Sequence, residues 1–199
     1  MTSLESALQR IAADLTISGV GFALIGGLAV SVRTEPRFTR DADFAVAVSG
    51  DTEAEALIRR LRASGYDVSA LVEHEAVGRL ATVRLVLGGE TEGPVMDLLF
   101  ASSGIEPEVV AGADSIELLP DLSVKVARID HLIALKVLSR DDIERPQDLV
   151  DLRALLRVAT AADVNGARQA LGLITARGYH RGRELVSQLE SLLDQRGAS

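Results

Sequence analysis

The stretch from Phe22 to Val48 constrains the fold of this chain more than any other part of the sequence. A short apolar run, Phe22 to Ile25, is typical of a buried strand, and it ends at Gly26 and Gly27. A helical pattern follows, then a polar loop, and then a second strand pattern from Asp41 to Val48. Strand, glycine turn, helix and strand therefore form one supersecondary unit, and the rest of the chain must be arranged around it.

The second strand pattern begins with two carboxylates, Asp41 and Asp43, which are separated by one residue. Side chains two positions apart on a strand point to the same face, so these two carboxylates project together. Adjacent carboxylates repel each other unless a positive charge lies between them, and a divalent metal ion is the commonest reason for such a pair. The alternative is a solvated strand end that carries two surface acids.

The glycine pair suggests a binding site for an anion. A strand that ends in Gly26 and Gly27 and turns into a helix leaves backbone N–H groups uncovered near the helix N-terminus, which suits phosphate. The alternative is a tight turn that needs a positive φ angle. Taken together with the acidic pair, the unit presents phosphate donors and metal ligands at neighbouring strand ends.

A third carboxylate, Asp97, lies inside the apolar run VMDLLF. Residues Leu80 to Leu87 alternate between apolar and polar side chains, and Pro94 to Ala101 returns as a second strand, so the two are expected to form a hairpin-like pair. An aspartate in an apolar strand is unfavourable unless it is paired or bound to a ligand. The alternative is a lone acid near a strand end.

Lysine is rare in this chain, which contains only Lys125 and Lys136. Lys136 lies in the largely apolar helix pattern from Asp130 to Ser139, where a buried lysine needs an anionic partner. The alternative is that its ammonium group reaches solvent from the helix edge. Asp148 and Asp151 share one face of the next helix pattern. Asp148 is expected to act as a base or to hold Lys136, and the alternative is ion pairing along the helix face.

This order of motifs resembles the signature of the polymerase-β-like nucleotidyltransferase superfamily. More narrowly, it is similar to the AbiEii/AbiGii abortive-infection toxin nucleotidyltransferases, which carry Gly-Gly followed by Arg-x-Thr-x-Asp-x-Asp. The resemblance covers roughly residues 20–155. The matching positions in this sequence are Gly26, Gly27, Arg37, Thr39, Asp41 and Asp43.

The resemblance implies an enzyme that moves a nucleoside monophosphate from an NTP to an acceptor hydroxyl with two Mg²⁺ ions. In this interpretation Asp41 and Asp43 bridge the ions, and Asp97 binds the nucleophile-side ion and helps to deprotonate the acceptor. One departure is Gln147, which stands where the family's Arg-x-Lys-Asp-x-x-Asp pattern commonly has lysine. The residues expected to bind the nucleotide are Gly26, Gly27, Arg37, Thr39, Lys136 and Asp148.

The resemblance also implies an RNA acceptor, commonly a tRNA 3′ end, and a cognate antitoxin protein. The formal net charge of −8 argues against broad, nonspecific binding of nucleic acid but leaves room for a local basic groove. Two alternatives remain open. A small-molecule acceptor, as in antibiotic-modifying relatives, is slightly favoured by the acidic pI of about 4.9, and a nucleotide-binding module without turnover is the other.

The expected fold class is α+β, with a mixed β-sheet nucleotidyltransferase core over residues 1–128 and a C-terminal helical region over residues 129–199 that packs on the core. The sequence has no cysteine and no apolar run of the ~20 residues that span a bilayer, so a cytoplasmic protein without membrane contact is expected. Residues Ser102 to Asp121 are expected to be irregular apart from a short strand at Ile116 to Leu118, and Tyr179 to Arg196 to form a helix.

Overall fold

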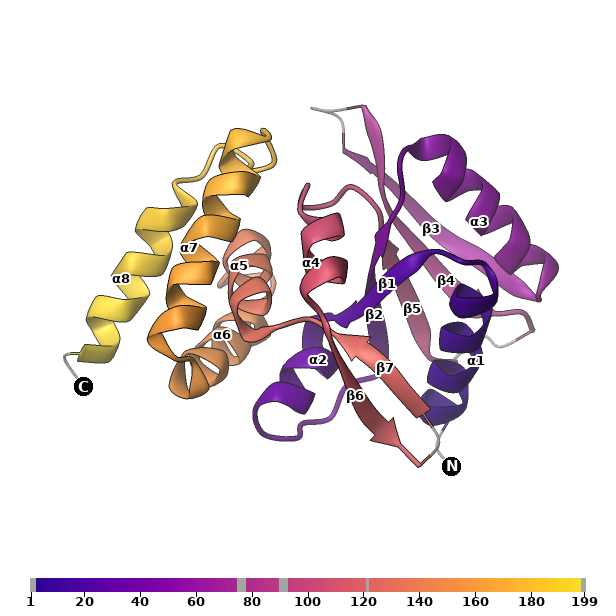
Figure 1. Ribbon diagram of the computed structural model, residues 1–199, viewed down its shortest axis with the longest axis horizontal. Helices are drawn as coiled ribbons and strands as arrows, with labels where there is room; N and C mark the ends of the chain where they lie inside the picture. The colour runs from indigo at the N-terminus through magenta and orange to yellow at the C-terminus, as the bar shows by residue number, and fades with distance from the viewer. Residues whose placement is uncertain (1–2, 75–77, 90–92, 121, 198–199) are drawn as a thin grey trace.

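A computed structural model describes residues 3–74, 78–89, 93–120 and 122–197. Within these residues a seven-stranded mixed sheet has the order β3-β4-β5-β2-β1-β7-β6, and helices cover both of its faces (Figure 1). The α+β class expected from the sequence is thereby confirmed. The strands are β1 (Gly21–Ile25), β2 (Asp41–Ala47), β3 (Tyr66–His74), β4 (Arg79–Leu87), β5 (Val95–Leu99), β6 (Asp114–Leu119) and β7 (Leu122–Val126). The helices are α1 (Ser3–Ile17), α2 (Gly26–Arg33), α3 (Asp51–Ala63), α4 (Glu106–Gly112), α5 (Ile129–Ser139), α6 (Pro146–Val158), α7 (Ala161–Ala176) and α8 (Leu185–Gly197).

The centre of the sheet is formed by strands that are distant in the sequence. β2 pairs with β1 in the antiparallel direction and with β5 in the parallel direction. Ala42, Phe44 and Val46 alternate along β2 and are fully buried, as the period-two pattern predicts. Full burial of a large apolar side chain contributes about 1.5–3 kcal/mol, so the pattern fixes which face of β2 turns inward. The register of β2 in turn places Asp43 at a defined position beside β5.

The two faces of the sheet are covered by different sets of helices. α1 and α3 lie on one side of the sheet, and α4 lies on the other, toward the C-terminal helices (Figure 1). α5 and α6 contact α2, so the C-terminal helices reach the segment that begins with Gly26 and Gly27. Among the described residues, no helix combines the length and the apolar character needed to cross a bilayer.

Two expectations about secondary structure were wrong. The segment expected to be irregular contains the helix α4, because Val109 and Val110 are buried and α4 packs on β1 and β2, whereas the short strand expected at Ile116 to Leu118 is present within β6. The last helix begins at Leu185 rather than at Tyr179. The residues before it form a loop in which glycines 178 and 182 have positive φ angles, so the apolar periodicity of α8 does not extend backward.

Candidate active site

Gly26 is required by both backbone and packing. It follows β1 directly with a φ angle of +66°, in the left-handed region that favours glycine. Ile25 and Asp43 are partners in the register of β1 and β2, and a β-carbon on Gly26 would collide with Oδ2 of Asp43. A β-carbon on Gly27 would collide with Nη2 of Arg37. The glycine pair therefore lets the turn lie directly against a carboxylate and a guanidinium group.

Asp43 and Asp97 are direct neighbours in the parallel pairing of β2 with β5. Asp97 is 9% exposed, and Asp43 is partly buried. Burial raises the pKa of Asp43 to about 6, and the negative charges of Asp97 and Asp41 act in the same direction, against the opposing effect of Lys136. Asp43 is thus a carboxylate whose negative charge is poorly compensated by its surroundings.

Asp97 has a resident cation. Arg84 lies opposite Asp97 in the antiparallel pairing of β4 with β5. Its Nε donates to Oδ1 of Asp97 at 2.9 Å, and its Nη2 donates to Oδ2 at 2.7 Å. A bidentate pair of this kind occupies both carboxylate oxygens and is among the stronger side-chain interactions. The third carboxylate is therefore already held, whereas Asp43 makes no ion pair among the described residues.

Lys136 is buried between two carboxylates of α6. Its Nζ lies 2.6 Å from Oδ1 of Asp148 and 2.8 Å from Oδ2 of Asp151, and the lysine is 8% exposed. Ser139 donates to Oδ2 of Asp148 at 3.0 Å, and Nε of Arg145 lies 3.2 Å from the same oxygen. The anionic partners expected for a buried Lys136 are thus carboxylates of the protein itself, Asp148 and Asp151.

Asp151 joins three separate segments. Besides Lys136 of α5, it accepts two hydrogen bonds of 2.8 Å from Arg37, which lies in the loop before β2. Gln147 donates to its Oδ1 at 3.0 Å. Burial raises the pKa of Asp151, but the hydrogen bonds from Arg37, Lys136 and Gln147 outweigh this effect and leave the pKa below its usual range. Asp151 therefore stays ionised and fixes the position of α5 and of Arg37 over the glycine turn.

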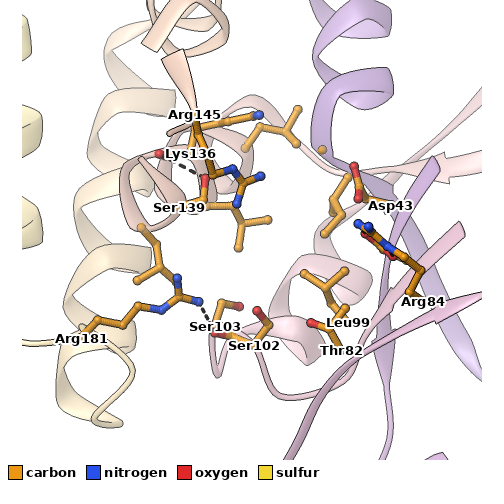
Figure 2. Close-up of a pocket in the computed structure, with 16 residues that line it drawn as sticks. Asp43, Thr82, Arg84, Leu99, Ser102, Ser103, Lys136, Ser139, Arg145 and Arg181 are labelled. Atoms are coloured by element: carbon orange, nitrogen blue, oxygen red, sulfur yellow. Dashed lines mark hydrogen bonds and ion pairs between the residues drawn. The ribbon is translucent and has the colours of Figure 1, made fainter. Parts of the chain in front are cut away.

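A cavity of about 440 Å³ lies between the sheet and the C-terminal helices. Asp43 and Arg84 lie on its sheet side, while Lys136, Arg145 and Arg181 lie on its helical side (Figure 2). Four of the residues predicted from the sequence meet here. They are Gly26, Asp43, Asp97 and Lys136.

The other predicted site residues lie around this cavity. Arg37, Thr39 and Asp41 line a second hollow near the start of β2. Thr39 donates to the backbone oxygen of Asp41 at 3.3 Å, and Asp41 is exposed. Asp148 lies behind Lys136 and is 3% exposed. Asp41 and Asp43 have one residue between them on β2, but of the two only Asp43 lines the cavity.

The carboxylates fit a divalent metal by the chemistry of their oxygen atoms. The raised pKa of Asp43 reflects negative charge that a cation would compensate, and the absent side chain of Gly26 leaves its carboxylate room. Asp97 offers the same donor type once Arg84 releases it. In the part of the chain that the structure describes, no group of three or more acidic, histidine or cysteine side chains is already arranged around an ion position.

Sequence reasoning misses two arginines of the cavity. Arg84 stands out in the sequence only as a polar position of an alternating strand, although counting residues back from the hairpin turn would have placed it near Asp97. Arg181 lies in the loop that was expected to be part of the last helix, so the pattern gives no signal for it. Ser102 also lines the cavity and lies in the segment expected to be irregular.

Solved structures that share this fold include nucleotidyltransferases. Over 88% of this chain and 99% of the other, the structure is similar to ANT(2")-Ia in complex with adenylyl-2"-tobramycin, with a TM-score of 0.56 and 16% identity. It is also similar to an antigenic nucleotidyltransferase-like protein from Paracoccidioides brasiliensis, with a TM-score of 0.55 and 17% identity over 94% of this chain and 92% of that one. At these identities the likeness shows the fold, which is that of the polymerase-β-like nucleotidyltransferases.

The particular family follows from the sequence. A family model described as "Nucleotidyl transferase AbiEii toxin, Type IV TA system" matches residues 7–198. The chain therefore belongs to the AbiEii nucleotidyltransferase toxin family, and it is an enzyme that transfers nucleoside monophosphates. The resemblance inferred from Gly26, Gly27 and the acidic pair is confirmed. No curated protein matches the sequence.

Proposed function

We propose that this nucleotidyltransferase transfers a nucleoside monophosphate to RNA, at the 3′ end of a tRNA, as the toxin of a toxin–antitoxin pair. The observation that carries the proposal is the position of Asp43 and Asp97, side by side on β2 and β5, at the edge of a cavity whose opposite side is basic. The proposal includes a cognate antitoxin as a partner, and it places the enzyme in the cytoplasm, where NTPs and tRNA are found.

Asp41, Asp43 and Asp97 are proposed to hold two Mg²⁺ ions. When bound, these ions supply positive charge that stabilises the attacking and leaving oxygens of the transfer. Asp97 is proposed to accept the proton of the acceptor hydroxyl. The pair with Arg84 competes with this role, because each oxygen of Asp97 accepts a hydrogen bond from Arg84.

The triphosphate is proposed to bind at the Gly26–Gly27 turn, which begins α2 and has no side-chain cap hydrogen bond from Ile25. Lys136, with Asp148 behind it, is proposed to face the phosphates from the helical side. Its ammonium group is held at the cavity by Asp148 and Asp151. The side chain therefore has a fixed conformation before a phosphate binds. Arg37 and Thr39 are proposed to contact the nucleotide from the second hollow.

A labelling assay tests the proposal. The protein is incubated with Mg²⁺, each α-labelled NTP in turn and total bacterial RNA, and Asp43→Ala serves as the inactive control. We expect label in the tRNA band with wild type and none with the variant. Wild-type protein that binds nucleotide but labels no RNA would contradict the RNA acceptor.

A small-molecule acceptor is the second candidate. It is favoured by the fold shared with ANT(2")-Ia, whose structure contains adenylyl-2"-tobramycin, and by the net charge of −8, which suits a cationic acceptor. The same labelled NTPs, offered with a panel of aminoglycosides in place of RNA, test it. Label in a small-molecule product and none in RNA would select this candidate.

A further inference from the structure

The loop between α7 and α8 presents an arginine in a backbone conformation that side-chain-bearing residues rarely adopt. Arg181 has a φ angle of +53°, and among the described residues no other non-glycine residue has a positive φ angle. This conformation costs on the order of 1 kcal/mol or more for a residue with a side chain. A glycine would relieve the strain, so the position of this side chain calls for a reason.

The Arg181 side chain crosses toward the floor of the cavity (Figure 2). Its Nη2 donates to the backbone oxygen of Ser102, after the end of β5, in a long hydrogen bond of 3.4 Å. Within the described residues no carboxylate forms an ion pair with it. Two other arginines of this region are paired with carboxylates: Arg168 with Glu190, and Arg177 with Glu108. Arg181 is therefore a cation at the cavity without a protein anion.

Its electrostatic surroundings are positive. Burial lowers the pKa of Arg181, and the charges of Arg183 and Arg145 lower it further. Arg183 donates to the backbone oxygens of Leu138 and Val137 at 2.9 and 3.1 Å, which ties the loop to the end of α5. The repulsion among these arginines is maintained by the fold, and an anion placed between them would relieve it.

Arg145 supplies a second cation on the same side. Its only carboxylate partner in the described chain is Asp148, at 3.2 Å, which already accepts from Lys136 and Ser139. The Arg145 side chain is 60% exposed. We call Arg145 and Arg181 the basic wall. Asp43 lies across the cavity from the basic wall (Figure 2), and Asp97, its neighbour in the pairing of β2 with β5, also lines the cavity.

We propose that the basic wall, Arg145 and Arg181, is a binding site for a phosphate group of the substrate. A guanidinium group binds phosphate through two parallel hydrogen bonds, and both the NTP and the proposed RNA acceptor carry phosphates. A cationic acceptor such as an aminoglycoside would be repelled at this position. The inference rests on the proposed function, because it assumes that the reaction takes place at Asp43 and Asp97.

Two phosphates have the required chemistry: the triphosphate of the NTP, and a backbone phosphate of the RNA acceptor next to its 3′ hydroxyl. Arg181→Gln removes the charge and keeps much of the length, and Arg181→Lys keeps the charge but loses the bidentate geometry. Arg168→Gln is the matched control, because it removes the same charge from α7 at a residue that does not line the cavity. Circular dichroism confirms that each variant is folded.

The experiment measures two affinities for each variant. The first is the affinity for each NTP with Mg²⁺ and without RNA, by calorimetry. The second is the affinity for tRNA without NTP at several salt concentrations. If the phosphate belongs to the nucleotide, Arg181→Gln weakens NTP binding about tenfold. If it belongs to the acceptor, Arg181→Gln weakens tRNA binding, and the slope of log affinity against log salt falls by about one.

In either case the affinity of Arg181→Lys lies between those of Arg181→Gln and wild type, and the affinity of Arg168→Gln equals that of wild type. NTP and tRNA affinities that both stay within about twofold of wild type in a folded Arg181→Gln protein would overturn the inference. Binding is measured without turnover, so this result is distinct from a failure of the labelling assay. A wild-type protein that binds NTP through Arg181 and labels no RNA would overturn the RNA acceptor and leave the phosphate site in place.

Discussion

Arg84 and Asp97 face each other across the β4–β5 pairing and form a two-pronged ion pair, with N···O distances of 2.9 and 2.7 Å. This pair occupies the third carboxylate of the proposed active site, beside Asp43. A divalent ion that takes Asp97 as a ligand therefore competes with a guanidinium group for the same carboxylate. In the metal-free enzyme, Arg84 thus competes with a metal ion for Asp97.

Arg84→Ala should bind Mn²⁺ more tightly than wild type when no nucleotide is present. Removal of the guanidinium group frees both oxygens of Asp97, and the expected gain is about tenfold in affinity, or about 1.4 kcal/mol. The free Mn²⁺ signal in electron paramagnetic resonance measures it. Arg79→Ala is the control, because Arg79 lies on the same strand and pairs with Asp51 outside the cavity. Equal Mn²⁺ affinities in wild type and Arg84→Ala would contradict the competition.

Gly26→Ala should lose more stability than its φ angle alone explains. The left-handed conformation costs about 1–2 kcal/mol for alanine, and the new methyl group would also collide with Oδ2 of Asp43. Gly19→Ala is a matched control, since Gly19 has a φ angle of +71° and open space around its Cα. Urea unfolding measures both variants. A cost for Gly26→Ala no larger than that for Gly19→Ala would mean that Asp43 moves aside freely.

Asp43 should make the metal-free protein less stable as pH rises from about 4 to above 6. Its pKa is raised from 3.8 to about 6 in the folded state, so in this window the folded protein binds more protons than the unfolded chain. The resulting loss of stability is at most about 3 kcal/mol, because raising a pKa by one corresponds to ~1.4 kcal/mol. Unfolding is followed in EDTA across this range.

The matched variant for this titration is Asp43→Asn, which cannot ionise and should have a flatter pH profile and greater stability above the raised pKa of Asp43. Parallel pH profiles for wild type and Asp43→Asn would show that Asp43 titrates normally. Greater stability of the inactive variant would also mean that wild type retains an unfavourable carboxylate for its chemistry.

Asp151→Ala should destabilise the fold strongly. The substitution leaves Arg37 without its carboxylate and Lys136 with one partner, and breaking a buried pair costs about 3 kcal/mol or more. Asp142→Ala removes a carboxylate of the same kind from the exposed pair with Arg140, where the expected loss is below about 1 kcal/mol. Chemical denaturation compares the two. Similar losses for both variants would contradict the role of Asp151 in joining α5, α6 and the loop.

The part of the site that could be predicted from sequence depends on local geometry. The turn at Gly26 and the strand alternation of β2 predict that Asp43 lies beside the turn, as it does in the structure, because both follow from backbone rules that act over a few residues. Asp97 could be predicted as a site residue because an aspartate in an apolar strand is unfavourable unless it is paired or bound to a ligand. The partners of these residues could not be predicted in the same way. Arg84 meets Asp97 through the hairpin register, and Arg181 reaches Ser102 from a position 79 residues later in the chain.

Lys136 illustrates the same limit. The rarity of lysine and the apolar helix predict that its charge has an anionic partner, and this is correct. The sequence does not tell whether the partner is a phosphate or the carboxylates of the following helix. Likewise, the short helix α4 follows from its packing on β1 and β2 rather than from a strong local pattern, so it was missed.

The two sides of the cavity come from different portions of the chain: the carboxylates from the sheet, and Arg145 and Arg181 from the helical segments that follow it. Substitutions in the loop between α7 and α8 therefore leave the pairing of β2 with β5 untouched. If the phosphate bound by Arg181 belongs to the acceptor, descendants of such a protein can acquire a new acceptor by altering this loop while the phosphoryl-transfer chemistry is inherited unchanged. Acceptor specificity and catalysis are then free to evolve separately on one scaffold.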